Sequence, residues 1–211
     1  MFRILCACCL GILSPLLPAA EPVVLFNGKN LDGWTFDVID PEVKPEAIWS
    51  VEDGILICQG RPPGVIRTQQ DDYSNYELTL EWRWAPEGKP GNSGLLVHAS
   101  TPRGQFVWPK SLEVQLGHQN AGDFWMIGET VTVEGATPQG RRWLKRQESS
   151  EKEPGEWNTM KVRCKGDTIT VWVNGVLMNE GTSLSASKGA ICLQSEGAEI
   201  HFRKVELLPL E

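Results

Sequence analysis

Apolar and polar residues alternate with a period of two along three short stretches of the chain. The clearest is YELTLEWRW (76–84), and a similar alternation runs through 93–98 and 111–117. Because successive side chains of a β-strand point to opposite faces of its sheet, each apolar set marks a face that packs against a core. We therefore predict three β-strands, each with one buried face.

Strand signals recur along the rest of the chain, and no segment keeps a helical period. They cover 47–60, 64–68, 157–166, 167–180, 189–195 and 198–208. Asn174–Gly175, between two valines, is a strong hairpin signal because both turn residues must tolerate positive φ. So many short strands predict an all-β sandwich or barrel. No linker or internal repeat divides the chain, and we expect one domain over residues 21–211.

The polar segment 118–156 breaks this pattern and predicts a long excursion from the sheets. Its basic stretch RRWLKRQ (141–147) would suit an anionic ligand, but the acidic stretch that follows favours a solvated loop. Long loops on rigid β scaffolds often carry function, so the segment remains a candidate.

The face opposite the core carries groups that can do chemistry. If the three alternating strands are neighbours, one sheet face holds two carboxylates, a guanidinium, an imidazole and an amide: Glu81, Glu113, Arg83, His98 and Gln115. Gln194 and Arg203 also alternate onto an outer face and are candidates for the same set. A merely solvated face needs no such combination, and we expect the functional site here.

Each of these groups also has a plainer interpretation. Glu81 and Arg83 stand two residues apart on one strand face, where they would simply pair and hold the sheet. His98 would equally serve as a structural histidine. Glu113 and Gln115 would suit hydrogen bonding to a sugar without any catalytic role.

Residues 1–20 have the features of a secretory signal peptide. Arg3 precedes a short apolar run from Ile4 to Leu17, and Ala19–Ala20 ends it with small residues. The run is shorter than the roughly 20 residues that span a bilayer, so no stable membrane span is expected after cleavage. We expect export to the periplasm or the extracellular space. The formal net charge of −7 argues against a nucleic-acid partner, whose phosphates demand a basic surface.

Three cysteines remain beyond the predicted signal peptide: Cys58, Cys164 and Cys192. An odd number forbids complete pairing within the chain, and their spacing matches no zinc motif. Each lies in a strand-like run, so we expect buried free thiols, with one disulfide as the alternative.

The chain resembles the 3-keto-disaccharide hydrolase domain family over nearly all of the residues beyond the predicted signal peptide. The motifs that carry the resemblance are FNGKNLDGW (26–34), YELTLEWRW (76–84), WPKSLEVQL…AGDFW (108–125) and KGAICLQSEGAEIHFRKVEL (188–207). Singly the motifs are weak, but together and in this order they are specific.

This resemblance implies a concanavalin A-like jelly-roll β-sandwich of two antiparallel sheets, exported from a bacterial cell. It further implies hydrolysis of glycosides whose sugar is oxidised at C3, with the outer face of a concave sheet as the carbohydrate cleft. The alternatives are a non-catalytic, lectin-like carbohydrate-binding domain and a cell-surface interaction module, because the fold alone does not decide function.

The residues around Glu113 argue against standard glycosidase chemistry. A retaining glycosidase needs two carboxylates about 5–5.5 Å apart, and glucanases of this fold carry them in an E-x-D-x-x-E run. Here Glu113 is followed by Gln115 and Gly117 instead. A 3-keto sugar offers another route, because the C3 carbonyl acidifies the C2 hydrogen. A base removes that hydrogen, the C1 aglycone leaves by elimination, and water then adds to the product.

We expect Glu113 or His98 to be the base of this route. Arg83 or a bound metal would stabilise the enolate oxygen. Asp123, or whichever of His98 and Glu113 is not the base, would be the acid. No cofactor is certain, but His98, Glu113 and Asp123 together would make a mixed nitrogen and oxygen site for a divalent metal.

Substrate contacts are expected from the polar set and from neighbouring residues. Trp108 and Trp125 would stack on a sugar ring, with core packing as the alternative for both. The remaining candidates for sugar binding are Glu81, Lys110, Gln115, Gln194 and Arg203.

Overall fold

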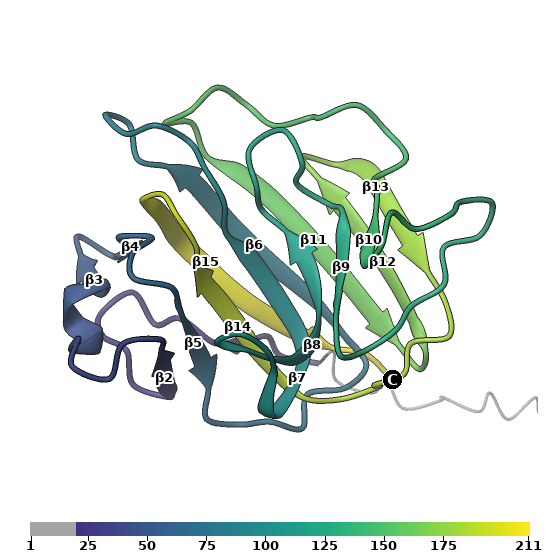
Figure 1. Cartoon of the computed structure of the whole chain (residues 1–211), viewed down its shortest axis with the longest axis horizontal. Coiled ribbons are helices and arrows are strands. Elements are labelled where there is room, and N and C mark those ends of the chain that lie inside the picture. Colours follow the sequence, from purple (N-terminus) through teal and green to yellow (C-terminus); the bar gives the residue numbers. More distant parts are fainter. Residues whose placement is uncertain (1–19) are drawn as a thin grey trace, which may run out of the picture.

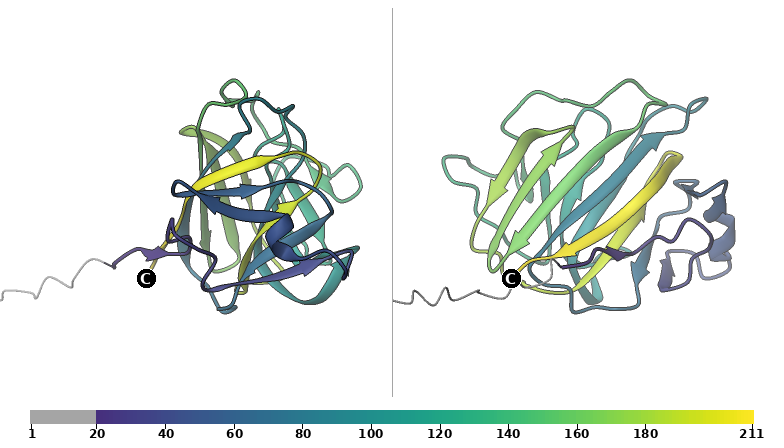
Figure 2. Two further views of the ribbon diagram at one scale, coloured as in Figure 1. Left: turned by 90° about the vertical axis from the view of Figure 1, so that its left-hand side faces the viewer. Right: turned by 180° about the vertical axis from the view of Figure 1, so that it is seen from behind.

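Two antiparallel β-sheets pack face to face and make up most of the molecule (Figures 1 and 2). The computed structural model describes residues 20–211, so the predicted signal peptide lies outside the described residues apart from Ala20. Within residues 20–211 no helix is long and apolar enough to cross a membrane. The predicted class, an all-β sandwich of two antiparallel sheets, is confirmed.

The first sheet has eight strands. In spatial order they are β13 (Val176–Gly181), β12 (Thr168–Val173), β11 (Asn158–Lys165), β6 (Tyr76–Trp84), β15 (Ile200–Pro209), β4 (Ile55–Cys58) and β3 (Trp49–Glu52), with β1 (Val23–Val24) paired to β15. The predicted hairpin at Asn174–Gly175 joins β12 to β13.

The second sheet has seven strands. In spatial order they are β10 (Arg142–Trp143), β9 (Phe124–Ile127), β8 (Trp108–Gln115), β7 (Gly94–Gln105), β14 (Ala190–Ser195), β5 (Gly64–Thr68) and β2 (Trp34–Val38). One short 3-10 helix, η1 (Pro45–Ala47), precedes β3. Strand β7 therefore lies between β8 and β14.

The core fills the space between the two sheets, as the alternation predicts. In β6 the side chains of Leu78, Leu80 and Trp82 are fully buried, while the polar residues between them are half-exposed. Leu112 and Val114 of β8 approach the same core from the other sheet. Burial of such side chains, at about 25 cal/mol per Å² of apolar surface, is the main stabilising contribution in a sandwich of this kind.

The expectation that all three alternating strands share one sheet is wrong. β7 and β8 pair with each other in the seven-stranded sheet, whereas β6 pairs with β11 and β15 in the eight-stranded sheet. The polar faces of β6 and β8 consequently look away from each other on opposite sides of the molecule. Alternation reports which face of a strand meets the core, but it does not report the sheet to which the strand belongs.

His98 departs from the predicted alternation because β7 is irregular at that residue. Its φ is +52°, and the β7–β8 register shifts between Val97 and Ser100. A positive φ is uncommon outside glycine and marks a local kink. The kink turns the imidazole inward, where it packs edge-on against Tyr76 of the opposite sheet with ring centroids 5.7 Å apart.

The segment 118–156 is only partly the excursion that its polarity predicts. It contributes β9 and β10, which extend the seven-stranded sheet beyond β8. The rest forms loops that return to the sandwich at β11. The three cysteines of the described residues are all buried and free, as expected. Burial raises the pKa of the Cys58 thiol to about 11.

Candidate functional site

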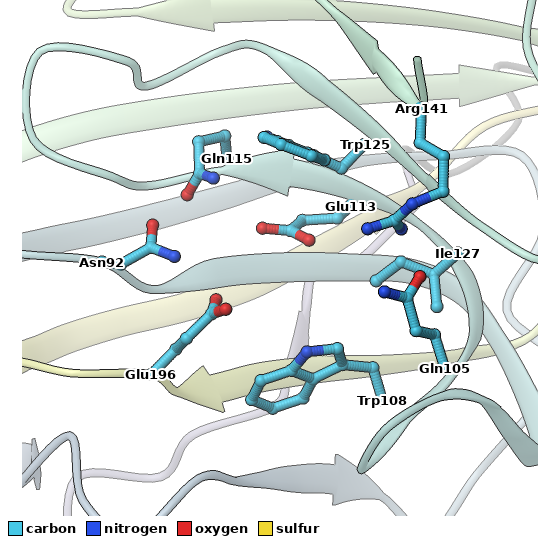
Figure 3. A pocket seen from close by; sticks show the side chains of 9 residues that line it. All are labelled: Asn92, Gln105, Trp108, Glu113, Gln115, Trp125, Ile127, Arg141 and Glu196. Carbon is cyan, nitrogen blue, oxygen red and sulfur yellow. The ribbon is translucent and has the colours of Figure 1, made fainter.

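A pocket of about 260 Å³ opens on the outer face of the seven-stranded sheet, over β8 and β9 (Figure 3). Its lining consists of Asn92, Gln105, Trp108, Glu113, Gln115, Trp125, Ile127, Arg141 and Glu196. Four residues expected from the sequence, Trp108, Glu113, Gln115 and Trp125, are thus brought together. Four polar ones, Asn92, Gln105, Arg141 and Glu196, were not among the predicted site residues.

Strand pairing places Glu113 at the centre of the pocket. Trp125 of β9 is its direct cross-strand partner on one side, and Leu96 of β7 is its partner on the other. Directly opposed residues point to the same face of a sheet, so the indole of Trp125 forms a wall beside the carboxyl. Gln115 follows two residues later on the same face.

Two glycines make room for the polar groups. A Cβ atom on Gly94 would lie 2.6 Å from Oε1 of Glu113 and 2.3 Å from Oε1 of Gln194. A Cβ atom on Gly117 would lie 2.7 Å from Oδ1 of Asn92. Real Cβ atoms do not approach other atoms so closely, and the absence of side chains at these positions allows the carboxyl and the amides to lie over the sheet.

Burial dominates the electrostatics of Glu113. The side chain is 6% exposed, and desolvation raises the pKa of its carboxyl to about 8. The negative charge of Glu196 adds to the rise, while Gln194 and the positive charge of Arg141 oppose it. The carboxyl is therefore poised to exchange a proton near neutral pH.

Glu196 is the second carboxyl of the pocket and has a similar character. Desolvation raises its pKa to about 7, and Asn92 opposes the shift. The sequence signal for this residue was the alternation along β14. Cys192 and Gln194 face outward there, so the same period of two continues to Glu196 just beyond the strand.

Arg141 supplies the positive charge of the pocket. Its guanidinium lies over Trp125, 5.6 Å from the ring centroid, and donates a 3.1 Å hydrogen bond to the carbonyl of Met126. The residue belongs to the basic stretch that the sequence presents as a solvated loop. Arg141 is exposed, as that interpretation expects, and it also lines the pocket because the extension of the sheet by β9 and β10 brings the end of the loop over β8.

The two tryptophans lie on the outer face of the sheet and not in the core between the sheets. Trp108 packs in an outer cluster with Leu96 and Ile127, and it is 8% exposed. Trp125 is half-buried and borders the pocket. Indole faces on both sides of a carboxyl are suited to a sugar ring, whose apolar face packs well on an aromatic side chain.

Asp123 does not line the pocket. Its side chain is buried, and both carboxylate oxygens are already bonded. One oxygen accepts hydrogen bonds from Arg142 and the other accepts a 2.7 Å hydrogen bond from the backbone N–H of Lys145. These contacts attach β10 and its following loop to β9. The expectation that Asp123 is the catalytic acid is therefore wrong, because its carboxylate is committed to a structural ion pair.

His98 is also outside the pocket, contrary to its expected role as base or acid. Its ring is 1% exposed, and Nδ1 lies 2.9 Å from the carbonyl oxygen of Ala186. Burial lowers its pKa, which keeps the imidazole neutral at pH 7. With His98 between the sheets and Asp123 bound to Arg142, the three residues predicted to share a metal do not meet. Within residues 20–211 no group of three or more His, Cys, Asp or Glu side chains is placed to hold a metal ion.

The candidates on the eight-stranded sheet form a separate cluster. Glu81 pairs with Arg203, and both Arg83 and Arg203 stack on Trp157 with their guanidinium carbons 4.6 and 4.5 Å from the ring centroid. Glu81, Arg83 and Arg203 thus lie on the outer surface of the eight-stranded sheet, away from the pocket. Their assignment to the site is wrong, since β6 and β15 belong to the other sheet.

The last two candidates lie near the pocket without lining it. Gln194 is fully buried over Gly94, next to Glu113. Lys110 is exposed at the start of β8, against Gly104 and Gly128. Gln194 is placed to support the carboxyl, whereas Lys110 is outside the pocket lining.

Solved structures with the same architecture are concanavalin A-like lectins and glucanases, and this class describes the fold. A β-glucanase of Bacillus licheniformis is 11% identical with a TM-score of 0.59, over 92% of this chain and 100% of that chain. A carbohydrate-binding module of Bacillus subtilis is 12% identical with a TM-score of 0.57, over 82% and 93%. A candidate glycosyl hydrolase of Parabacteroides distasonis is 24% identical with a TM-score of 0.64, over 90% and 100%.

The family follows from the sequence match. The model of the 3-keto-alpha-glucoside-1,2-lyase-like domain matches residues 21–208, and the chain belongs to this family. No curated protein matches the chain. The resemblance found in the sequence motifs is thereby confirmed at the level of the family.

Proposed function

We propose that this protein cleaves 3-keto-glycosides by removing the C2 proton, expelling the aglycone from C1 and adding water to the product. The observation that carries the proposal is the pair of carboxyls, buried Glu113 and half-buried Glu196, in one pocket with the guanidinium of Arg141. Family membership supports the substrate class. Export to the periplasm or the extracellular space stays a prediction.

The order of the three charged groups matches the order of the reacting atoms. In Figure 3 the Glu113 carboxyl lies between Arg141 and Glu196. In the sugar, C2 lies between the C3 carbonyl and the C1 glycosidic oxygen. We assign Glu113 as the base at C2, Arg141 as the stabiliser of the oxygen on C3, and Glu196 as the acid at the leaving oxygen.

Each step balances with these groups. Glu113 takes the proton from C2, and the electrons of the C–H bond form the enolate at C3, opposite Arg141. Collapse of the enolate forms the C1–C2 double bond as the C1–O bond breaks, and Glu196 donates its proton to the departing oxygen. Water then adds across the double bond, with its oxygen on C1 and a proton on C2, and gives the 3-keto monosaccharide.

Glu196 also changes one expectation from the sequence. No second carboxylate follows Glu113 along its own strand, but Glu196 supplies one from the end of β14. The choice of elimination over double displacement therefore depends on the family match and not on the number of carboxylates.

Substitution of each carboxyl tests these roles, with two 3-keto glucosides that carry a nitrophenol or an ethanol leaving group. We expect Glu113→Gln to lose at least about a thousandfold in kcat on both substrates, because both need the base. Glu196→Gln should lose about a hundredfold with ethanol but less than about tenfold with nitrophenol, which departs without a proton. Glu81→Gln, on the opposite sheet, is the matched control. Full turnover by Glu113→Gln would contradict the proposal.

A lectin-like function is the second candidate, since two indoles flank the pocket and a carbohydrate-binding module shares the fold. A binding domain has no need of two carboxyls with raised pKa values, so catalysis is favoured. Calorimetric binding of a 3-keto glucoside without release of its aglycone, with or without EDTA, would establish the lectin instead. The EDTA arm also measures any metal requirement.

A further inference from the structure

A second pocket borders the first, and Glu196 lines both. It has a volume of about 260 Å³, and its other lining residues are Gly60, Arg61, Pro62, Pro63 and Gly197. Under the proposed function, Glu196 protonates the oxygen that leaves C1. The second pocket therefore begins where the aglycone of a bound glycoside begins.

The walls of this pocket are apolar. They consist of two proline rings and glycine backbone, together with the charged residues Glu196 and Arg61. Among residues 20–211, no hydroxyl or amide side chain is part of the lining. A second sugar would face proline rings with its hydroxyl groups, and polar groups that lose water without gaining partners are costly. An aromatic ring has no hydroxyl groups and so loses no hydrogen bonds to water in this pocket. The exposed guanidinium of Arg61 is able to lie over the face of such a ring.

Hydrogen bonds fix this wall before any ligand arrives. The N–H of Gly197 donates to the carbonyl of Gly60 at 2.6 Å, and the hydroxyl of Ser195 donates to the carbonyl of Pro62 at 2.9 Å. The N–H of Ile39 donates to the carbonyl of Pro63 at 3.0 Å. A preformed wall spares a ligand the entropic cost of ordering it.

The close approach of Gly60 to the opposite segment adds to this rigidity. A Cβ atom on Gly60 would lie 2.3 Å from the carbonyl oxygen of Ala198, so the two segments are in direct backbone contact. The segment that forms the wall of the second pocket is therefore packed directly against the segment that carries Glu196. This contact holds the two pockets at a constant distance from each other.

We propose that the second pocket binds an apolar, ring-shaped aglycone, and that the preferred substrates are 3-keto derivatives of aryl or arylalkyl glycosides. This inference rests on the proposed function. Each pocket is smaller than the roughly 300–1,000 Å³ of sites for drug-sized ligands, so each accommodates a single ring. One sugar ring and one aromatic ring fill the two pockets on either side of Glu196.

The test compares three 3-keto glucosides whose aglycones are benzyl alcohol, ethanol and a second glucose. The benzyl and ethyl leaving groups have similar basicity, so their difference in kcat/KM reports contacts with the aglycone, while the glucose leaving group is the more acidic of the three and is favoured by its chemistry alone. We expect kcat/KM for the benzyl substrate to exceed that for the ethyl substrate by at least about tenfold, from burial of the ring. The disaccharide should be cleaved more slowly than the benzyl substrate.

Substitution in the wall locates the effect. Pro63→Ser should bring the ratio of benzyl to ethyl kcat/KM close to one, while Pro154→Ser, an exposed proline in the loop before β11, should leave it unchanged. A ratio near one in the unmodified protein, or faster cleavage of the disaccharide, would overturn the apolar aglycone site and leave the proposed function standing. Absence of cleavage of all three substrates would instead overturn the proposed function, and this inference with it.

Discussion

A Cβ atom on Gly94 would lie 2.6 Å from Oε1 of Glu113, so the missing side chain of one residue provides the space that the carboxyl of the other fills. The two residues stand on paired strands, β7 and β8. A methyl group at Gly94 would push the carboxyl out of the position in which it lies between Arg141 and Glu196.

Replacement of Gly94 by alanine should therefore lower kcat/KM on a 3-keto glucoside by at least about tenfold, since small displacements of a catalytic group are costly. The matched control is Gly88→Ala, in an exposed loop, where the nearest contact of a new Cβ would be 3.1 Å from the Cβ of Ala85. Steady-state kinetics of both variants check the effect. Equal kinetics in the two variants would show that the carboxyl does not depend on the space over Gly94.

The pH profile of kcat/KM should be bell-shaped with a maximum between about 7 and 8. The active form has Glu113, with a pKa of about 8, deprotonated and Glu196, with a pKa of about 7, protonated. This form is a minor fraction of the protein at every pH, and the fraction is largest between the two pKa values. In Glu196→Gln the alkaline limb should disappear. The acidic limb should remain and should then report Glu113 alone, because Glu196 is already protonated along that limb in the parent. An unchanged profile in this variant would contradict the coupling of the two carboxyls.

The same burial predicts a stability that depends on pH. The folded protein raises the pKa of Glu113 from 4.5 to about 8, so the folded state holds a proton that the unfolded state has lost. The contribution of this carboxyl to stability is therefore complete below about pH 4.5, and it is lost as pH rises toward 8. Glu113→Gln removes this loss, so its stability relative to the parent should rise by about 4 kcal/mol between pH 5 and pH 9, at about 1.4 kcal/mol per pKa unit. Its advantage should shrink toward pH 5, as followed by urea denaturation. A constant difference across this range would refute the burial of a titrating carboxyl.

Asp123→Asn should behave as a structural change and not as loss of an acid. It removes one partner of a mostly buried ion pair with Arg142, and we expect a loss of about 2–4 kcal/mol in the free energy of unfolding. Asp37→Asn, which breaks the exposed pair with Arg103, should cost less than about 1 kcal/mol. The limbs of the pH profile of Asp123→Asn should stay at the pH values of the parent. A displaced alkaline limb would return Asp123 to the list of acids.

The sequence was sufficient for the fold class and for the centre of the site. Alternation identifies the outer faces of the strands, and it places Glu113 and Gln115 together because they lie on one strand. It also contained Glu196, two residues beyond Gln194, as a continuation of the same period. Periodicity reveals the face on which a residue lies because that face depends only on neighbouring residues of the same strand.

Two kinds of information were not available from the pattern. Membership in a sheet depends on pairing across long separations in sequence, and for that reason Glu81, Arg83 and Arg203 were assigned to the wrong side of the molecule. Backbone irregularity is the second kind, since the positive φ of His98 reverses its side chain within an otherwise regular strand. The approach of Arg141 to the pocket similarly depends on β9 and β10, whose pairing a polar segment does not reveal.

The placement of β7 between β8 and β14 has a consequence for how this protein tolerates change. Glu113 and Glu196 are far apart in sequence, yet their strands are separated only by β7, at two interstrand spacings of roughly 4.8 Å. The hydrogen-bonded ladder fixes the distance between these strands, whatever the length of the chain that connects them. Insertions and deletions in the loop of 128–141, which carries Arg141, can therefore alter what enters the pocket while the two carboxyls keep their geometry, which makes that loop the natural place for new substrate preferences to arise.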